Sequence, residues 1–130
     1  MKALAIYLFV LVSPFLTDPY NDISDDIINA VKQGNAQTIA KYFNEKIDLK
    51  ILDQEDVYSK AQAESVLKDF FAKHKIKDFT PSHSSANKTA NQFVVGSLET
   101  SNGKYRLSFL IKKFEDKYLI SQFRIETENE

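Results

Sequence analysis

The sequence contains no cysteine and no tryptophan, and its two histidines are His74 and His83. Without cysteine the chain can form no disulfide, no thiol nucleophile and no thiolate-bound metal centre. Two histidines are also too few for a histidine-rich metal site. We therefore expect neither a metal nor a cofactor.

The chain also lacks an excess of charge of either sign. Its formal net charge is -1 at pH 7 and its isoelectric point is about 6.1. This balance gives no basic footprint for nucleic acid or for an anionic membrane. With 130 residues, 43% hydrophobic and 27% charged, the chain is long enough to bury one core and too short for two domains.

The longest apolar run lies at the N-terminus, where Met1-Lys2 precedes ten apolar residues from Ala3 to Val12. A positive start followed by a run of this length is typical of a signal peptide, whereas a membrane-spanning helix needs about twice as many residues. We predict a signal peptide over residues 1–17, one mature domain over residues 18–130, and export to the periplasm or the exterior. The mature chain would keep no stable membrane anchor.

Three stretches have the helical period of 3.6 residues. The first begins near Asp22 and ends at Gly34, and the second follows Asn35. The third begins at Ser59, which can form a capping box with Gln62. Their expected buried residues are, in order, Ile23, Ile27, Ala30 and Val31; Ala36, Ile39, Ala40 and Phe43; and Ala63, Val66, Leu67, Phe70 and Phe71.

The remaining segments favour strands. Residues 47–51 alternate between apolar and polar, and the acidic residues 53–56 that follow indicate a solvated turn. Residues 78–84 have strand character, but Pro81 restricts them to an edge or bulged strand. Residues 91–126 predict three antiparallel strands, joined by a tight turn at Asn102-Gly103 and a three-residue loop at 115–117.

These turns set a register for the last three strands. Gly96 is expected opposite Phe109, Phe109 opposite Phe123, and Arg106 between Glu99 and Glu126 in a charge ladder. One face of the three strands is then core. Its predicted residues are Val94, Gly96, Leu98, Tyr105, Leu107, Phe109, Ile111, Leu119, Ser121, Phe123 and Ile125.

The opposite face of these strands carries apolar residues that no predicted helix is left to cover. They are Phe93, Val95, Leu110 and Ile120, with Gln122 among them. An apolar patch on a soluble domain usually marks a partner site. We therefore expect a homodimer, or another protein partner, on this face.

Several blocks of the sequence resemble a bacterial family of unknown function, domain-of-unknown-function family 4783. They are residues 57–64, 67–71, 96–103 and 117–120, and the resemblance covers nearly the whole mature chain. It implies an α+β domain with the nuclear transport factor 2-like (cystatin-like) fold, in which a curved antiparallel sheet wraps around N-terminal helices as a cone. Proteins of this fold often dimerise through the outer sheet face. The resemblance supplies no catalytic residue.

Enzymes of this fold class use an acid or a histidine paired with a tyrosine inside the cone. The predicted core face of the last three strands has no ionisable group except Tyr105. We therefore favour an exported, non-catalytic module that binds a protein or a small apolar ligand. The alternative is a small acid-base enzyme, such as an isomerase, dehydratase or hydrolase. In either case the expected pocket-lining residues are Tyr42, Phe43, Tyr58, Phe70, Phe71, Phe109 and Phe123.

The register predicts that both Phe70 and Phe109 are buried. Replacing Phe109 by alanine should then lower the free energy of unfolding by about 3–5 kcal/mol, because it leaves a cavity in the core. Urea unfolding measures this change. A midpoint that barely moves would contradict the predicted register.

Overall fold

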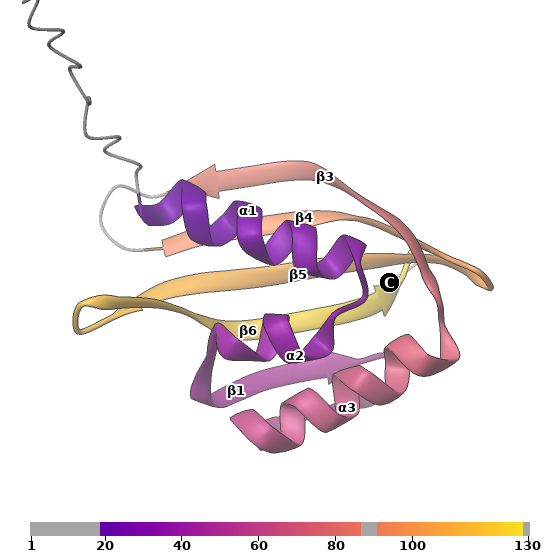
Figure 1. Cartoon of the computed structure of the whole chain (residues 1–130), viewed down its shortest axis with the longest axis horizontal. Helices are drawn as coiled ribbons and strands as arrows, with labels where there is room; N and C mark the ends of the chain where they lie inside the picture. Colours follow the sequence, from indigo (N-terminus) through magenta and orange to yellow (C-terminus); the bar gives the residue numbers. More distant parts are fainter. Residues whose placement is uncertain (1–18, 87–90, 129–130) are drawn as a thin grey trace, which may run out of the picture.

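The computed structural model of the protein describes residues 19–86 and 91–128. The predicted signal peptide, residues 1–17, lies outside the described residues. Nine elements follow one another along the chain (Figure 1): α1 (Pro19–Lys32), α2 (Ala36–Lys41), β1 (Phe43–Ile51), β2 (Gln54–Ser59), α3 (Lys60–Lys73), β3 (Ile76–Ala86), β4 (Asn91–Thr100), β5 (Gly103–Phe114) and β6 (Lys117–Thr127).

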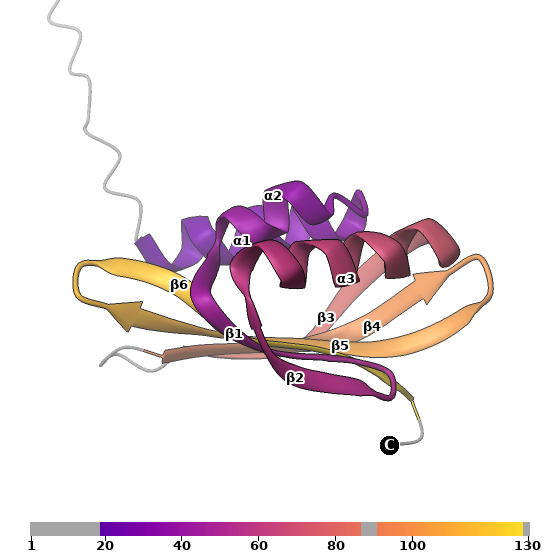
Figure 2. The ribbon, with the colours of Figure 1, turned by 90° about the horizontal axis from the view of Figure 1, so that it is seen from below.

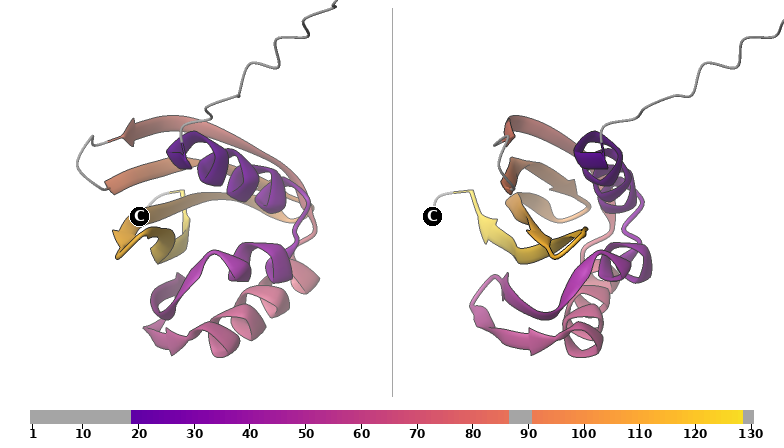
Figure 3. Two further views of the ribbon diagram at one scale, coloured as in Figure 1. Left: turned by 60° about the vertical axis from the view of Figure 1, so that its left-hand side comes forward. Right: turned by 90° about the vertical axis from the view of Figure 1, so that its left-hand side faces the viewer.

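The six strands form one sheet in the order β2-β1-β6-β5-β4-β3. All neighbours are antiparallel except β1 and β6, which are parallel. This pair corrects the expectation of a purely antiparallel sheet. A parallel pair needs a long crossover, and the chain from β2 to β5 supplies it. Figures 2 and 3 show the three helices on one face of the curved sheet, so the predicted α+β architecture is confirmed.

The helices begin and end where local chemistry satisfies their terminal backbone groups. At the end of α1, Gly34 has a φ of 63°, which favours glycine. The Gly34 N–H donates to Val31 O and the Asn35 N–H to Ala30 O, both at 2.9 Å, which is the Schellman pattern. At the start of α3, Ser59 and Gln62 form the predicted capping box with two 3.2 Å hydrogen bonds.

Strand β2 was not predicted. The turn before it consists of Leu52 and Asp53, and the strand begins at Gln54, inside the segment expected to be a turn. Every β2 residue except Tyr58 is exposed. An exposed edge strand has no buried face to impose an alternating pattern, so periodicity could not reveal it.

The β4–β5 turn consists of Ser101 and Asn102, one residue earlier than predicted, and Thr100 lies opposite Gly103. The Thr100 hydroxyl accepts a hydrogen bond from the Asn102 N–H at 3.3 Å and donates toward the Gly103 carbonyl oxygen at 2.8 Å. These contacts close the turn before Gly103.

The earlier turn shifts every β4–β5 pair by two positions, which preserves the faces and changes the partners. Glu99 lies opposite Lys104, so it is not part of the predicted ladder with Arg106. Gly96 lies opposite Leu107 rather than Phe109. An even shift keeps each side chain on its own face because the strand period is two.

The β5–β6 hairpin has the predicted register over part of its length, although its turn is shorter than predicted. Its turn has two residues, Glu115 and Asp116, and a bulge at Ser121 adds one residue to β6. Beyond the bulge, the predicted pairs Phe109–Phe123 and Arg106–Glu126 are confirmed.

Between the turn and the bulge, however, the faces of β6 are exchanged. Ile120 is 0% exposed and belongs to the core, whereas Leu119 and Ser121 are only half-buried. The prediction that placed Ile120 on the outer surface is therefore wrong. The reason is the extra residue, since one residue reverses which side of a strand faces the core.

Phenylalanines fill the space between the sheet and the helices. Phe123 on β6 contacts Phe43 edge-on, with ring centroids 5.8 Å apart, and stacks on Phe109 at 6.3 Å. All three side chains are at most 1% exposed. The predicted burial of Phe70 and Phe109 is confirmed.

Strand β3 is an edge strand with a bulge between Pro81 and His83, as Pro81 indicated. The bulge brings the β3 backbone close to Gly96. A Cβ atom on Gly96 would lie 2.4 Å from the Thr80 carbonyl oxygen. Glycine is therefore required here by the approach of β3, and not, as its predicted pairing suggested, by the Phe109 ring.

Gly96→Ala should destabilise the protein by roughly 1–3 kcal/mol, because backbone rather than a flexible side chain must move. The change is measured by urea unfolding. Ser97→Ala, at the neighbouring half-buried position, is the matched control and should stay within about 0.5 kcal/mol. Equal stability of the two variants would contradict the close approach of β3.

Candidate functional site

The described helices all pack on one face of the sheet, and we call the opposite face the outer face (Figure 2). Because side chains alternate along a strand, the residues between core positions point to this face. The outer face therefore collects side chains from several strands into one surface. It is the first of four candidate sites.

An apolar patch lies on β4 and β5 of the outer face and consists of Phe93, Val95 and Leu110. Phe93 lies directly opposite Leu110, and Leu110 lies opposite Gln122 of β6. The three apolar side chains are half-buried rather than fully exposed. Four of the five predicted interface residues thus lie together, and Ile120 is absent from them because it is in the core.

An ionic network occupies the β1–β6–β5 part of the outer face. The carboxylate of Glu126, 13% exposed, lies 3.5 Å from Lys50, 3.4 Å from Arg106 and 4.0 Å from Arg124. Arg124 is also 3.9 Å from Glu55 on β2. The Arg106–Glu126 half of the predicted ladder is confirmed. The Arg106 guanidinium is therefore paired with an acid within the sheet.

A shallow cavity of about 350 Å³ joins the patch to the network. Its lining residues are Phe93, Val95, Arg106, Ser108, Gln122, Arg124 and Glu126. With its amide turned to face the guanidinium, the Gln122 oxygen accepts hydrogen bonds from Arg124 Nε at 2.9 Å and Nη2 at 3.1 Å. The cavity is thus lined by polar side chains at one end and by apolar side chains at the other.

The interior is the second candidate. It brings together the predicted pocket-lining phenylalanines, which are all buried. Tyr42 and Tyr58 lie at its margin and are half-buried. The Tyr42 hydroxyl donates to Asp26 Oδ2 at 3.3 Å. Burial, and then the negative charge of Asp26, raises the pKa of Tyr42. Tyr42 is therefore held in its neutral form rather than activated as an acid.

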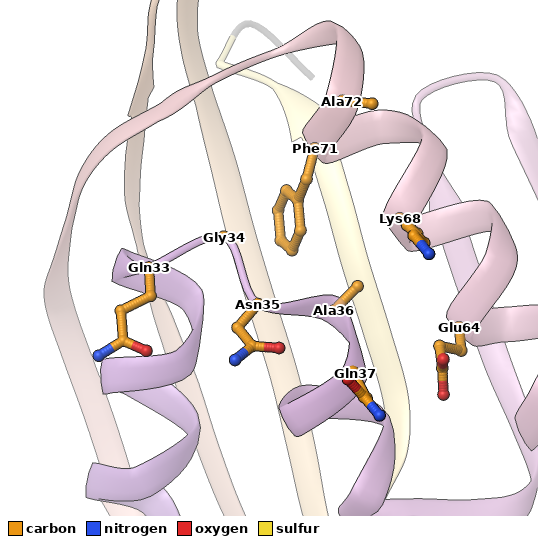
Figure 4. A pocket seen from close by; sticks show the side chains of 9 residues that line it. All are labelled: Gln33, Gly34, Asn35, Ala36, Gln37, Glu64, Lys68, Phe71 and Ala72. Carbon is orange, nitrogen blue, oxygen red and sulfur yellow. The ribbon is translucent and has the colours of Figure 1, made fainter.

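A third candidate is a groove of about 680 Å³ between the α1–α2 connection and α3, which the sequence did not reveal. Figure 4 shows the Phe71 ring pointing from α3 toward the connection that carries Gln33 and Asn35. The Asn35 side chain already caps α2 by accepting from the Thr38 N–H at 3.1 Å. Amides and charges in such a groove are ordinary helix-surface residues, so no sequence signal marks it.

The fourth candidate surrounds His74 at the end of α3. Its ring stacks on Phe70 with centroids 4.2 Å apart, and its Nδ1 lies 2.8 Å from Asn102 Oδ1 and 3.3 Å from the Tyr105 hydroxyl. In the chain His74 directly follows α3, and no local sequence pattern links it to these partners. Its partners lie 28 and 31 residues away in the chain, so only the return of the β4–β5 turn to α3 assembles them.

Within the described ranges, no helix is both long and apolar enough to cross a membrane. The same residues contain no group of three or more acidic or histidine side chains arranged to hold a metal ion.

Arg106→Ala should change the free energy of unfolding by at most about 1 kcal/mol, because a half-exposed ion pair contributes little. Urea unfolding provides the measurement. Glu126→Ala is the comparison variant and should cost more, since it removes the carboxylate that three cations share. A larger loss for Arg106→Ala than for Glu126→Ala would contradict the central position of Glu126.

Comparison with known proteins adds the family. Residues 24–126 match the family described as a domain of unknown function, DUF4783. A member from Bacteroides uniformis ATCC 8492 is 34% identical, with a TM-score of 0.78 over 83% of this chain and 99% of that chain. A second, from Bacteroides ovatus ATCC 8483, is 33% identical, with a TM-score of 0.75 over 81% and 94%.

More distant similarity concerns the fold alone. A nuclear-transport-factor-2-like protein of unknown function from Shewanella oneidensis MR-1 is 16% identical, with a TM-score of 0.61 over 84% of this chain and 99% of that chain. No curated protein matches the sequence. The resemblance drawn from the sequence blocks is thereby confirmed: the chain belongs to the DUF4783 family and has the nuclear transport factor 2-like fold.

Proposed function

We propose that the protein is an exported, non-catalytic interaction module that forms a homodimer through its outer face. The observation that carries this proposal is the apolar patch of Phe93, Val95 and Leu110 on the face without a described helix. Burying the patch against a second copy would remove apolar surface from water. The apolar N-terminal run supports export.

The edges of the sheet favour association through the face rather than through added strands. At the β3 edge, Pro81 lacks an N–H and the bulge interrupts the strand. At the β2 edge, the Asp56 carboxylate accepts the Val57 N–H at 2.7 Å. That N–H is thus not offered to an incoming strand, and each edge is interrupted at one position.

The charges of the outer face suit a second copy of the same chain. The network holds the cations Lys50, Arg106 and Arg124 beside the acids Glu55 and Glu126. A two-fold dimer places the same surface on both sides of its interface. A surface with both signs can pair with itself, whereas a surface of one sign would repel its copy.

The interior supports a non-catalytic role over the acid-base alternative. Phe43, Phe109 and Phe123 pack against one another where that reaction would need a polar pocket. A small apolar ligand in the cone would have to displace these rings. The outer face requires no such rearrangement, so we favour a protein partner over a small ligand.

Sedimentation of the mature chain, residues 18–130, at micromolar concentration tests the proposal. The unchanged protein should sediment as a dimer, and Leu110→Asp as a folded monomer, because a carboxylate would be buried at the centre of the interface. Circular dichroism checks that the variant is folded.

Ser65→Asp is the control for the added negative charge, since Ser65 is an exposed, neutral residue on α3. This variant should remain a dimer. A monomeric unchanged protein, or a dimer that is insensitive to Leu110→Asp, would end the proposal.

A further inference from the structure

His74 lines a cavity of about 270 Å³ that lies between the end of α3 and the β1–β2 turn. This cavity is separate from the outer face and shares no lining residue with the cavities there. We propose that it binds a small organic cation, an alkylammonium group, with the Nε2 atom of His74 as a hydrogen-bond acceptor.

The orientation of the His74 ring is fixed from one side. An amide oxygen can only accept, so Asn102 Oδ1 at 2.8 Å requires the proton of neutral His74 to be on Nδ1. The orientation of the amide is set by its Nδ2, which donates to Lys73 O at 3.4 Å. The lone pair of the neutral ring is then on Nε2.

None of the described residues hydrogen-bonds Nε2. A purely structural link between α3 and the β4–β5 turn uses Nδ1 alone, and a backbone bond from Ser101 N–H to Lys75 O at 2.9 Å already joins these segments. The Nε2 atom therefore takes no part in the link between α3 and the β4–β5 turn. Fixing one imidazole nitrogen by a second group is also how proteins prepare the other nitrogen for a ligand.

The other groups at the cavity select a cation. The exposed Asp53 of the β1–β2 turn and Gln54 at the start of β2 add acceptors, and Lys73 is paired with Asp69 at 3.1 Å. One carboxylate therefore remains in excess. The Phe70 side chain forms part of the apolar wall, which suits the alkyl chain of such a ligand. The volume is below the range of drug-sized pockets, so the ligand must be small.

The test is imidazole nitrogen NMR on the uniformly ¹⁵N-labelled mature chain, at a pH where both histidines are neutral. His83, exposed on β3, is the internal control. The proposal requires that His74 carry its proton on Nδ1. Adding n-butylammonium chloride should then shift the His74 Nε2 resonance saturably and leave that of His83 unchanged.

A variant pair checks the role of the carboxylate. Asp53→Asn should weaken the apparent affinity for n-butylammonium about tenfold, because it removes a charge-assisted hydrogen bond. Asp116→Asn, in the β5–β6 turn, removes the same charge elsewhere and should have no effect.

Three results would overturn the proposal: a proton on Nε2 of His74, a shift that is equal at His83, and a titration without saturation. A saturable response to zinc chloride but not to n-butylammonium would assign a metal site instead and would also overturn it. None of these outcomes depends on the oligomeric state, so the proposal stands or falls separately from the dimer.

Discussion

The packing of Phe123 between Phe43 and Phe109 is the constraint on which the rest of the structure depends. These rings join β1, β6 and β5, and the parallel β1–β6 pair lies inside the sheet, between β2 and β5. Their burial requires the helices to cover the same face. The helices that bury this face cannot also cover the other one, so the outer face and its apolar patch follow from how the core is filled.

The bulge at Ser121 adjusts β6 to this core. It allows Ile120 and Phe123 to point inward although three positions separate them, which a regular strand does not permit. On the reverse side of β6, Arg124 and Glu126 alternate with core residues and meet cations and acids from neighbouring strands. A partly buried carboxylate is tolerated there because it is paired. One strand thus supplies both the centre of the core and the centre of the ionic network.

The candidate sites differ in which parts of the chain form them. The outer face is a product of strand alternation, and most of its residues could be located from the sequence. The His74 cavity depends on the end of α3, the β1–β2 turn and the β4–β5 turn meeting in space. In the interior, three of the predicted pocket-lining phenylalanines pack against one another, and this directs a functional interpretation toward the surface.

The sequence by itself determined where the helices lie, because the Ser59 capping box, Gly34 and the 3.6-residue period act within a few residues. The predicted end of the second helix was wrong, since Phe43, expected on its buried face, is the first residue of β1. The sequence also determined which residues of β4 and β5 face the core, since alternation survives a shift of two positions. Only the tertiary structure decided the side of Ile120, the existence of β2, the need for Gly96 and the partners of His74. Each depends on backbone from a distant segment, a bulge, a neighbouring strand or a returning turn, and no local pattern records those contacts.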